Sequence, residues 1–457
     1  MTTDKTPFEK DLRELLTKHG IAAPKFAHGT AAFNPAKPQC LYSGPIYDQD
    51  ELVAGVGALA EGKWSVAGEH VARFERMFSA YLGQMESVMV NSGSSADLLM
   101  VAAAKARYGW KDGDGIIVSP AGFPTTISSI TLNGLRPVFV DIEWETLNAD
   151  NDAIESALED GQPKSNHWGW DFRQPIRAIL VSPVLGNPPD MDRLTTLAAR
   201  YGVKLLLDGC DSLGSTWRGK HLSDYADAST CSFFPSHHIS TLQGGMISSN
   251  DTELISLARS MSAWGKSCWC SGAGNMLPNG CCGKRFSNWL PSHPETVVDH
   301  RYVYGTAHAY NLQPLDLQGA LGCVQMGKIA KIHEARRKAW TRLLFIWGKS
   351  PLRLETEIVH PLDSADPSWF GFPLICPSYT YKHALVTHLE AAGVQTRNYF
   401  AGTISAQPGY AHLGKPSDQP NANQVLEKVF FIGVNPGWTD EHFAHIEKTV
   451  SLFQPPK

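Results

Sequence analysis

Short apolar runs alternate with longer helical patterns through the middle of the chain, from about residue 88 to residue 246. The runs end in small or polar residues and cover residues 88–90, 115–119, 137–141, 176–183 and 203–208. Buried parallel strands have this character, and their alternation with helices predicts a doubly wound α/β sheet. Ligands of such sheets bind beyond the carboxyl ends of the strands, so the residues that follow these runs are the first candidates for chemistry.

The regions outside this sheet have different patterns. Residues 1–20 carry apolar side chains at helical spacing among charged ones, which indicates an amphipathic surface helix. Helical patterns also cover residues 315–332 and 334–347, and residues 350–457 mix strand-like and helical runs. The domains that we expect are an N-terminal arm (1–45), a large cofactor-binding domain (46–335) and a smaller C-terminal α+β domain (336–457).

The periodicity fails between residues 264 and 304, where Gly, Pro, Cys, Asn and Ser dominate. A segment of this length without a pattern is usually functional, or is held by something other than a hydrophobic core. The chain has nine cysteines, and five of them fall between Cys231 and Cys282. Clustering of an odd number of cysteines fits metal ligation or a reactive thiol better than a disulfide framework.

Composition limits the classes of function. Hydrophobic residues make up 43% of the chain and charged residues 19%, as in an ordinary globular enzyme. The net charge of -5 supplies no basic field that would attract nucleic acid or an anionic membrane. The charged N-terminus is unlike a secretory signal, and no apolar run approaches the length that spans a bilayer. We therefore expect a cytoplasmic enzyme that binds neither nucleic acid nor a membrane.

Three groups of residues that follow strands of the predicted sheet could carry chemistry. Residues 91–97 place a glycine and serines at the start of an apolar helix, where backbone N–H groups could bind a phosphate or serve only as a helix cap. Asp208 ends a strand, and its carboxylate could pair with a pyridinium nitrogen or cap a helix. His237 and His238 could provide a base, metal ligands or structural contacts. Taken singly, none of these groups identifies a function.

Taken in order, these groups resemble the DegT/DnrJ/StrS family of sugar aminotransferases and dehydrases, which has the aspartate aminotransferase fold (type I fold of pyridoxal phosphate enzymes). The resemblance extends from about residue 53 to residue 436. It rests on the order of Gly93-Ser94-Ser95, residues 121–126, Asp208 and residues 232–245.

The resemblance implies a set of cofactor-binding residues. A glycine-serine-serine turn and a later serine hold the cofactor phosphate, an aromatic residue stacks on the pyridine ring, and an aspartate binds the ring nitrogen. A tract at residues 310–313 matches a segment that a neighbouring subunit supplies, which implies a homodimer. The implied cofactor-binding residues are Gly93, Ser94, Ser95, Phe123, Asp208, Asp211, Ser232 and Asn311.

The most informative departure from the aminotransferase pattern is His237, which takes the position of the lysine that binds the cofactor covalently. Imidazole cannot form an imine with the cofactor aldehyde, so the resting state of a transaminase is excluded. The cofactor must be held noncovalently, as pyridoxamine or pyridoxal 5'-phosphate. An imidazole can still remove a proton as a general base. This pattern is similar to that of the sugar 3-dehydrases within the family.

The cysteines resemble those of the iron-sulfur 3-dehydrases that act on CDP- or TDP-linked 4-keto-6-deoxyhexoses. The resemblance implies a [2Fe-2S] cluster with Cys210, Cys268, Cys270 and Cys282 as ligands. The loop between Cys270 and Cys282 is longer than in the family, and it offers Cys281 as a rival for the fourth ligand. A structural zinc site with four thiolates is the alternative interpretation.

The resemblance implies C3 deoxygenation of a nucleotide-linked 4-keto-6-deoxyhexose, with electrons from an NAD(P)H-dependent flavin or iron-sulfur reductase. Segments that line the sugar or diphosphate pocket in relatives correspond here to Asn187, His238 and Arg397. Gln243 replaces the usual glutamate and removes a charge near the active site. The alternatives are a 3-dehydrase that needs no external electrons and a non-catalytic protein of the same fold. The sequence does not distinguish CDP, TDP and GDP sugars.

Overall fold

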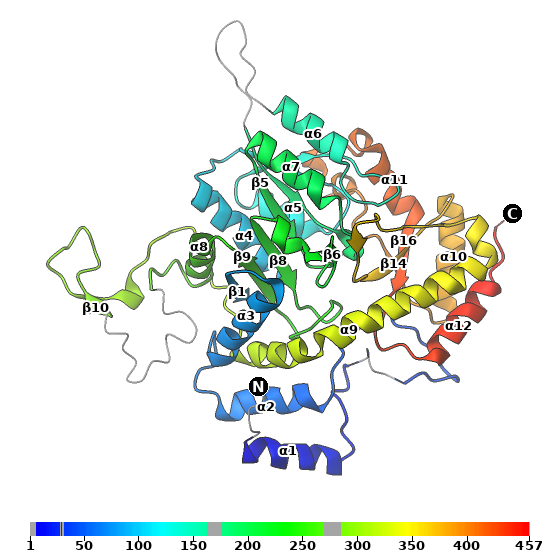
Figure 1. The fold of residues 1–457 in the computed structure, drawn as a ribbon, viewed down its shortest axis with the longest axis horizontal. Coiled ribbons are helices and arrows are strands. Elements are labelled where there is room, and N and C mark those ends of the chain that lie inside the picture. The colour runs from blue at the N-terminus through cyan, green and yellow to red at the C-terminus, as the bar shows by residue number, and fades with distance from the viewer. Residues whose placement is uncertain (1–5, 28, 30–31, 162–174, 269–284, 457) are drawn as a thin grey trace, which may run out of the picture.

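The computed structural model of the 457-residue chain describes residues 6–27, 29, 32–161, 175–268 and 285–456 (Figure 1). Its largest sheet has seven strands within these ranges, in the order β1-β9-β8-β5-β4-β2-β3. The strand bounds are β1 (Glu86–Val90), β2 (Gly115–Val118), β3 (Arg136–Phe139), β4 (Ile176–Val181), β5 (Lys204–Asp208), β8 (Ala228–Ser232) and β9 (Gly245–Ser249). Neighbouring strands are parallel from β8 to β3, whereas β9 is antiparallel to both β1 and β8.

Helices cover both faces of this sheet, because its strands point large apolar side chains to either side. Ile116 packs with residues of α4 (Gly93–Tyr108), α5 (Pro124–Thr131) and α8 (Thr252–Ser262). Its neighbour Ile117 packs on the other face, with residues of α6 (Asn151–Asp160) and α7 (Met191–Tyr201). Burial on both faces explains why the runs are apolar throughout rather than alternating. The predicted doubly wound, mixed sheet is confirmed.

A smaller unit with a sheet of its own comes later in the chain (Figure 1). Its antiparallel sheet has the order β12-β14-β16-β15, and α10, α11 and α12 accompany it. The predicted α+β character of the C-terminal region is confirmed. The bounds are β12 (Glu357–Ile358), β14 (Gly371–Ile375), β15 (Thr396–Asn398), β16 (Val429–Gly433), α10 (Tyr379–Ala391), α11 (Pro420–Lys428) and α12 (Asp440–Ser451).

One long helix, α9 (Asp316–Lys349), runs from the side of the large sheet to the smaller unit (Figure 1). The predicted helical patterns at residues 315–332 and 334–347 are confirmed, and they belong to this one helix. The apolar pattern is interrupted by His333 and Arg336, but both side chains are buried and the junction contains neither glycine nor proline. The helix therefore continues through the interruption. The domain boundary after residue 335 lies inside α9 and stays a prediction.

The N-terminal region is helical. It contains α1 (Pro7–Lys18), α2 (Gln49–Glu61) and α3 (Glu69–Leu82). Helix α1 has no buried residue, and Thr6 and Glu9 form a capping box at its start, so the predicted amphipathic surface helix is confirmed. No helix among the described residues is long and apolar enough to cross a bilayer.

The predicted irregular segment contains little secondary structure in its described parts, residues 264–268 and 285–304. These parts hold only the two-residue strands β10 (Phe286–Ser287) and β11 (Val298–Asp299), together with a short 3-10 turn at residues 300–302. A separate small sheet joins the two units, because β13 (Ala365–Asp366) pairs with β6 (Thr216–Trp217), which in turn pairs with β7 (Lys220–His221).

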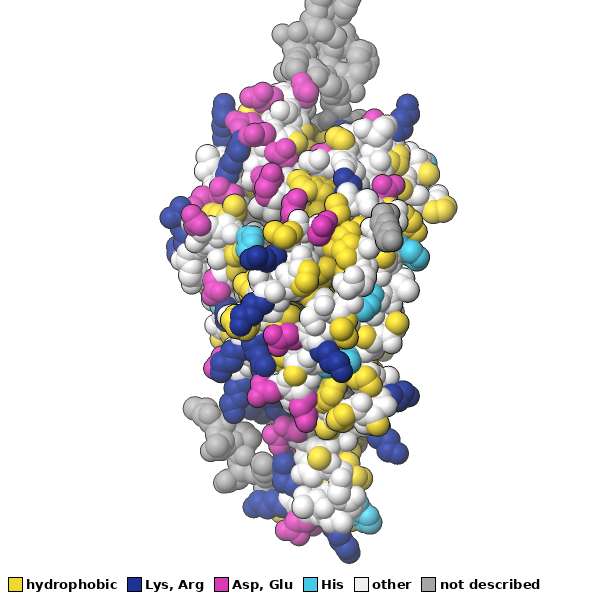
Figure 2. Space-filling view, turned by 90° about the vertical axis from the view of Figure 1, so that its right-hand side faces the viewer, with side chains coloured by type: hydrophobic (Ala, Val, Ile, Leu, Met, Phe, Trp, Pro, Cys, Tyr) yellow, Lys and Arg dark blue, Asp and Glu magenta, His cyan; other side chains and the backbone are white. Residues whose placement is uncertain are grey.

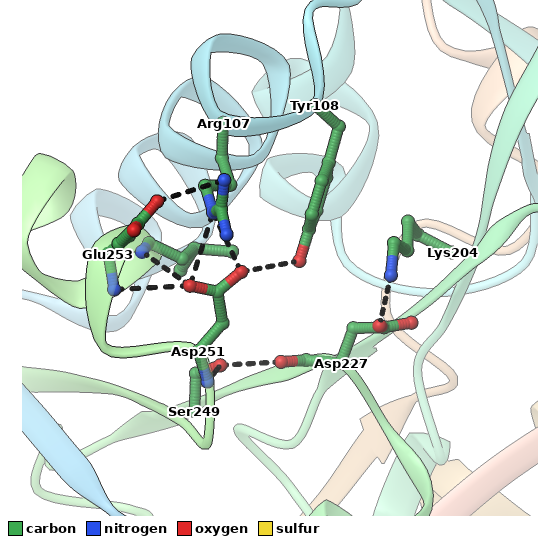
Figure 3. A network of polar contacts seen from close by, with 8 residues as sticks. Arg107, Tyr108, Lys204, Asp227, Ser249, Asp251 and Glu253 are labelled. Atoms are coloured by element: carbon green, nitrogen blue, oxygen red, sulfur yellow. Dashed lines mark hydrogen bonds and ion pairs between the residues drawn. The ribbon is translucent and has the colours of Figure 1, made fainter.

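A network of polar contacts lies where β5 and β8 begin (Figure 3). Lys204 Nζ donates to Asp227 Oδ1 at 2.7 Å, and Ser249 Oγ donates to the Asp227 carbonyl at 2.6 Å. Arg107 Nε, at the end of α4, donates to Asp251 Oδ2 at 2.9 Å. Because α4 starts where β5 and β8 finish, this network marks the end of the sheet opposite the carboxyl ends of its parallel strands. On the face seen in Figure 2, acidic and basic side chains are interspersed rather than gathered by sign.

Candidate active site

A cavity of about 660 Å³ lies where the carboxyl ends of β4, β5 and β8 meet the first turn of α4. Phe370, Phe431 and Arg397 close it from the sheet of the smaller unit. The position agrees with the rule that open α/β sheets bind ligands beyond their strand ends. Predicted site residues on its wall are Gly93, Ser94, Phe123, Asp208, Cys210, Asp211, Ser232, His237 and Arg397.

One end of the cavity is formed by the start of α4. Ser92 is the N-cap, and its Oγ accepts a hydrogen bond from the Ser95 backbone N–H at 3.1 Å. A Cβ atom at Gly93 would lie 2.5 Å from Ser232 Cβ, so these two segments approach as closely as a glycine allows. Ser94 and Ser232 line the cavity, whereas Ser95 does not, and its Oγ donates to Asn91 Oδ1 at 2.7 Å. Helix N–H groups and two hydroxyls thus form a site for a dianion.

A buried carboxylate, Asp208, lines the same cavity at the end of β5. Its Oδ2 accepts a hydrogen bond from Thr126 Oγ1 at 2.6 Å, and its Oδ1 accepts from the Cys210 backbone N–H at 3.2 Å. Both bonds fix the direction of the carboxylate. An acid held in this way can accept a hydrogen bond from a protonated ring nitrogen.

A second carboxyl group, Asp97, lies beside Asp208. Its Oδ1 accepts from Thr230 Oγ1 at 2.6 Å, while its Oδ2 is buried without a hydrogen-bond partner. Carboxylate oxygens of both aspartates and the Cys210 Sγ lie within 4.8 Å of one another. Burial, and then the negative charge of Asp208, raises the pKa of Asp97 well above its usual range. Burial and the two carboxylates likewise raise the pKa of the Cys210 thiol.

His237 follows β8 and presents its imidazole to the cavity, with 15% of the side chain exposed. Its Nδ1 lies 3.3 Å from the Ser232 carbonyl oxygen, which can only accept, so Nδ1 carries the hydrogen and Nε2 is free to take a proton. Asp211 Oδ1 lies 3.7 Å from that Nε2. Burial lowers the pKa of His237 to about 4, and burial together with Asp208 raises the pKa of Asp211 to about 7. The imidazole is therefore neutral and able to act as a base.

Aromatic rings enclose the cavity. The exposed ring of Phe123 contacts Phe400 edge to face, with centroids 5.8 Å apart. Arg397 lies over the ring of Tyr42 at 4.2 Å and donates from Nη1 to the Thr396 carbonyl at 2.7 Å. Among the described residues, no carboxylate forms an ion pair with Arg397. Its remaining guanidinium donors are therefore able to bind an anionic ligand.

Besides Ser95, three further predicted residues do not line the cavity. His238 is buried, and its Nε2 bonds the Ser368 carbonyl oxygen at 2.6 Å. Asn187 is buried after the turn at residues 184–186 and donates from Nδ2 to the Thr146 carbonyl at 3.0 Å. Asn187 Oδ1 and His238 Nδ1 are buried without a hydrogen-bond partner, and a substrate contact by either residue stays a prediction. Asn311 is exposed and pairs with Ala263 in an isolated bridge, so its implied role in a neighbouring subunit stays a prediction.

The predicted cluster ligands are only partly described. Cys210 lines the cavity, and Cys268 is half-buried at the edge of the described segment. Cys270 and Cys282, and the rival Cys281, lie outside the described residues. The ligand set therefore stays a prediction.

Sequence reasoning left several functional side chains without a role. Thr126 holds Asp208, and Asp97 adds the second carboxyl group. Asp97 follows Gly93 by four residues, so both lie on one face of α4. This spacing could have identified Asp97 as a site residue from the sequence. Phe370 and Phe431 gave no such signal, because Phe370 precedes β14 and Phe431 lies in β16, both far from residues 91–245 in the sequence.

The residues of the cavity fit a pyridoxamine phosphate. The N-terminus of α4, Ser94 and Ser232 offer donors for a phosphate, and the Asp208 carboxylate offers an acceptor for a ring nitrogen. The unpartnered Oδ2 of Asp97 provides a further polar atom near Asp208. No lysine is among the described residues that line the cavity, so a covalent attachment to this wall is excluded.

Comparison with known proteins agrees with this geometry. The model of the DegT/DnrJ/EryC1/StrS aminotransferase family matches residues 47–451. A dTDP-4-dehydro-2,6-dideoxy-D-glucose 3-dehydratase of Saccharopolyspora spinosa is 34% identical over 94% of this chain and 88% of its own length. The lipopolysaccharide biosynthesis protein RfbH of Salmonella typhimurium is 33% identical over 94% of this chain and 93% of its own.

Solved structures are similar as well. A mutant of GDP-4-keto-6-deoxymannose-3-dehydratase (ColD) with bound GDP-perosamine is 26% identical and superposes with a TM-score of 0.75, over 90% of this chain and 99% of that one. The Escherichia coli GDP-4-keto-6-deoxy-D-mannose-3-dehydratase with bound hydrated PLP gives a TM-score of 0.74 at 26% identity, over 90% of this chain and 100% of that one. The predicted aminotransferase fold is confirmed, and the chain belongs to the DegT/DnrJ/EryC1/StrS aminotransferase family.

Proposed function

We propose that the chain is a pyridoxamine-phosphate-dependent 3-dehydratase of a nucleotide-linked 4-keto-6-deoxyhexose. The observation that carries the proposal is a neutral imidazole, His237, on the wall of a cofactor-sized cavity whose described lining contains no lysine. An aminotransferase of this fold needs that lysine, whereas a 3-dehydratase needs only a base. The names of the relatives, which are 3-dehydratases of dTDP- and GDP-linked sugars, support the same reaction.

The cofactor would be held at both ends. Ser94, Ser232 and the N-terminus of α4 would bind its phosphate, and Asp208 would accept a hydrogen bond from its ring nitrogen. Phe123 would cover the ring from the open side of the cavity. When bound, pyridoxamine phosphate supplies an amine for the C4 ketone and an electron-accepting ring, which together allow the C3 hydroxyl to leave.

The protein's own contribution is proton transfer at His237. Nδ1 is occupied by the Ser232 carbonyl, so Nε2 takes the proton. Asp211, 3.7 Å away, stabilises the imidazolium while it holds that proton. The aromatic wall around the ring excludes water, so the proton is retained for the departing hydroxyl.

We further propose that Cys210, Cys268, Cys270 and Cys282 bind a [2Fe-2S] cluster. Supporting this, the thiol of Cys210 lies on the cavity wall beside two carboxyl groups, and Cys268 is half-buried at the edge of a described segment. Such a cluster would supply the two electrons of reductive deoxygenation one at a time. An NAD(P)H-dependent reductase would deliver them.

Two further parts of the proposal concern binding. The free donors of Arg397 suit the diphosphate of the nucleotide sugar. Asn311 would serve the cavity of a second copy in a homodimer, since it is exposed and lies outside the cavity of its own chain.

The test is turnover by anaerobically purified protein with pyridoxamine phosphate, a chemical reductant and CDP-, dTDP- or GDP-linked 4-keto-6-deoxyhexoses. We expect one of these sugars to yield a product with one oxygen atom fewer by mass spectrometry. His237→Asn should lower kcat by about 10²-fold or more, because it removes the base. Arg342→Met is the matched control. Arg342, on α9, forms an exposed ion pair with Asp440 of α12, so this variant should leave turnover unchanged.

A second variant tests the noncovalent cofactor. His237→Lys should gain visible absorption from pyridoxal phosphate that borohydride fixes to the chain, and it should lose dehydration. If the wild-type protein itself were labelled by borohydride in the presence of pyridoxal phosphate, the proposed function would be contradicted.

A further inference from the structure

A buried arginine lies behind the catalytic base. Arg336, on α9, is 1% exposed, and no carboxylate of the described residues lies within ion-pair distance of it. Its Nη1 donates to the carbonyls of Trp369 at 3.2 Å, Phe370 at 3.5 Å and Val434 at 3.1 Å, and its Nε has no partner. Burial lowers the pKa of Arg336 to about 10, so it stays charged at neutral pH. Asp211 raises this pKa, although it lies beyond ion-pair distance. A buried cation without a direct ion pair costs stability.

The chain segment that Arg336 binds is held by other buried side chains too. His238 Nε2 lies 2.6 Å from the Ser368 carbonyl oxygen, and His333 Nδ1 lies 2.7 Å from Ser368 Oγ. Residues 368–370 are thus held by His333 and Arg336 of α9 and by His238, which follows β8. Phe370, the last residue of this segment, therefore has a fixed position.

Phe370 connects this segment to the base. Its ring lines the cavity and stands perpendicular to the imidazole of His237, with centroids 5.5 Å apart and an interplanar angle of 89°. The Nδ1 atom of the imidazole is held by the Ser232 carbonyl. A shift of Phe370 would therefore let the imidazole turn away from the cofactor side of the cavity.

We infer that Arg336 is a positioning residue for His237: it fixes Phe370 against the imidazole, and its buried positive charge opposes protonation of that ring. The inference rests on the proposed function in so far as His237 is the base. It assigns a role in the reaction to a residue that would touch neither cofactor nor substrate.

The charges around His237 support the electrostatic half of the inference. Burial is the main cause of its low pKa, and Arg336 lowers the pKa further. Arg336 also lowers the pKa values of His238 and His333, whereas Asp211 is the one group that faces Nε2 with negative charge. The titratable or charged groups near His237, or elsewhere on the cavity wall, are Asp97, Asp208, Cys210, Asp211, His238, Arg336 and Arg397.

The experiment compares Arg336→Met, which removes charge and donors, with Arg336→Lys, which restores the charge alone. The full-length chain is labelled with ¹³C-histidine, and the His237 resonance is assigned by its loss in His237→Asn. The titration of His237 is then followed by NMR with and without pyridoxamine phosphate. Arg342→Met, an exposed arginine on the same helix, controls for the loss of a charge from α9.

We expect the His237 midpoint to rise in Arg336→Met and to return toward the wild-type value in Arg336→Lys. Both variants should lower kcat by about 10- to 10²-fold with little change in KM, because the base is displaced. If Arg336→Met does not fold, Arg336→Gln removes the charge and keeps donors for the carbonyls, and it should give the same rise.

An unchanged midpoint in folded Arg336→Met or Arg336→Gln would overturn the inference. So would equal rises in the methionine and lysine variants, since a merely structural role would not depend on charge. The NMR titration does not depend on turnover. A wild-type protein without dehydratase activity would contradict the proposed function, but the effect of Arg336 on the His237 titration could still be measured.

Discussion

At the scale of single residues, Gly93 is a position on the cavity wall that cannot accept a side chain without a local shift. Its missing Cβ would fall 2.5 Å from Ser232 Cβ and 2.8 Å from Ser232 Oγ. Both atoms belong to the wall that we propose for the phosphate. A methyl group there must push either the start of α4 or Ser232 away from its place.

The expected result of Gly93→Ala is about a tenfold rise in the Kd of pyridoxamine phosphate, which corresponds to about 1.4 kcal/mol. Isothermal titration calorimetry of the full chain measures it. Gly327→Ala is the matched control, because a Cβ at that helical position meets no atom within 4 Å. Equal affinities in the two variants would contradict the assignment of the phosphate to this turn.

The type of a residue was enough to predict its chemistry where only one kind of side chain can perform a reaction. An imidazole in place of a lysine excludes an imine whatever the fold, so His237 could be predicted from sequence. The direction of a side chain could not be predicted in this way. His237 and His238 are adjacent, yet only the first lines the cavity, because the Ser368 carbonyl binds the second.

At the scale of elements, the strands differ in how visible they are in the sequence. The five apolar runs correspond to β1 to β5, whose residues are large and aliphatic. Strands β8 and β9 consist of small and polar residues, Ala-Ser-Thr-Cys-Ser and Gly-Met-Ile-Ser-Ser, and were missed. Both are fully buried between other strands and helices, so their stability comes from tertiary pairing rather than from local preference.

The irregular segment at residues 264–304 leads to a prediction about Cys268. Cys268→Ser should remove one thiolate of the proposed cluster, so anaerobic protein should lose iron and its visible absorption. Reductive turnover should fall at least tenfold. Cys323→Ser, a half-buried cysteine on α9 whose Sγ contacts the His70 carbonyl, is the control.

Full reductive turnover by Cys268→Ser would contradict the electron-relay role. It would leave the alternative of a 3-dehydratase that needs no external electrons. Zinc in place of iron in the wild-type protein would instead support the structural site.

At the scale of the whole molecule, buried neutral histidines link stability to pH. The pKa of His237 is lowered to about 4 and that of His333 to about 3, mainly by burial. An unfolded chain titrates its histidines near 6.5, so below that pH the unfolded state binds more protons. Each histidine therefore contributes stability that is complete above about pH 6.5 and is lost as the pH falls toward the folded-state value.

Between pH 7 and pH 5.5, we expect the free energy of unfolding to fall by about 1 kcal/mol for each of these histidines. Urea denaturation at several pH values measures the slope. His333→Gln should give a shallower slope, since it removes one of the titrating groups. The same slope in wild type and variant would show that His333 is not buried in its neutral form.

The overall fold was the most predictable level, because alternation of apolar runs with helices constrains a sheet strongly and the motif order matches one family. Interruptions were harder to interpret. His333 and Arg336 are polar positions within the apolar pattern of α9, and both are buried because Ser368 Oγ and the Trp369 carbonyl bind their side chains.

That uninterrupted helix has a consequence for access to the cavity. Helix α9 spans 34 residues and packs against α3 at one end and α12 at the other (Figure 1). Swinging the smaller unit away as a rigid body would require bending this helix in its middle, where neither proline nor glycine provides a hinge. If α9 stays straight, a nucleotide sugar would pass the exposed ring of Phe123, which contacts Phe400, and the width of that passage, rather than a hinged opening of two lobes, would set how fast it exchanges.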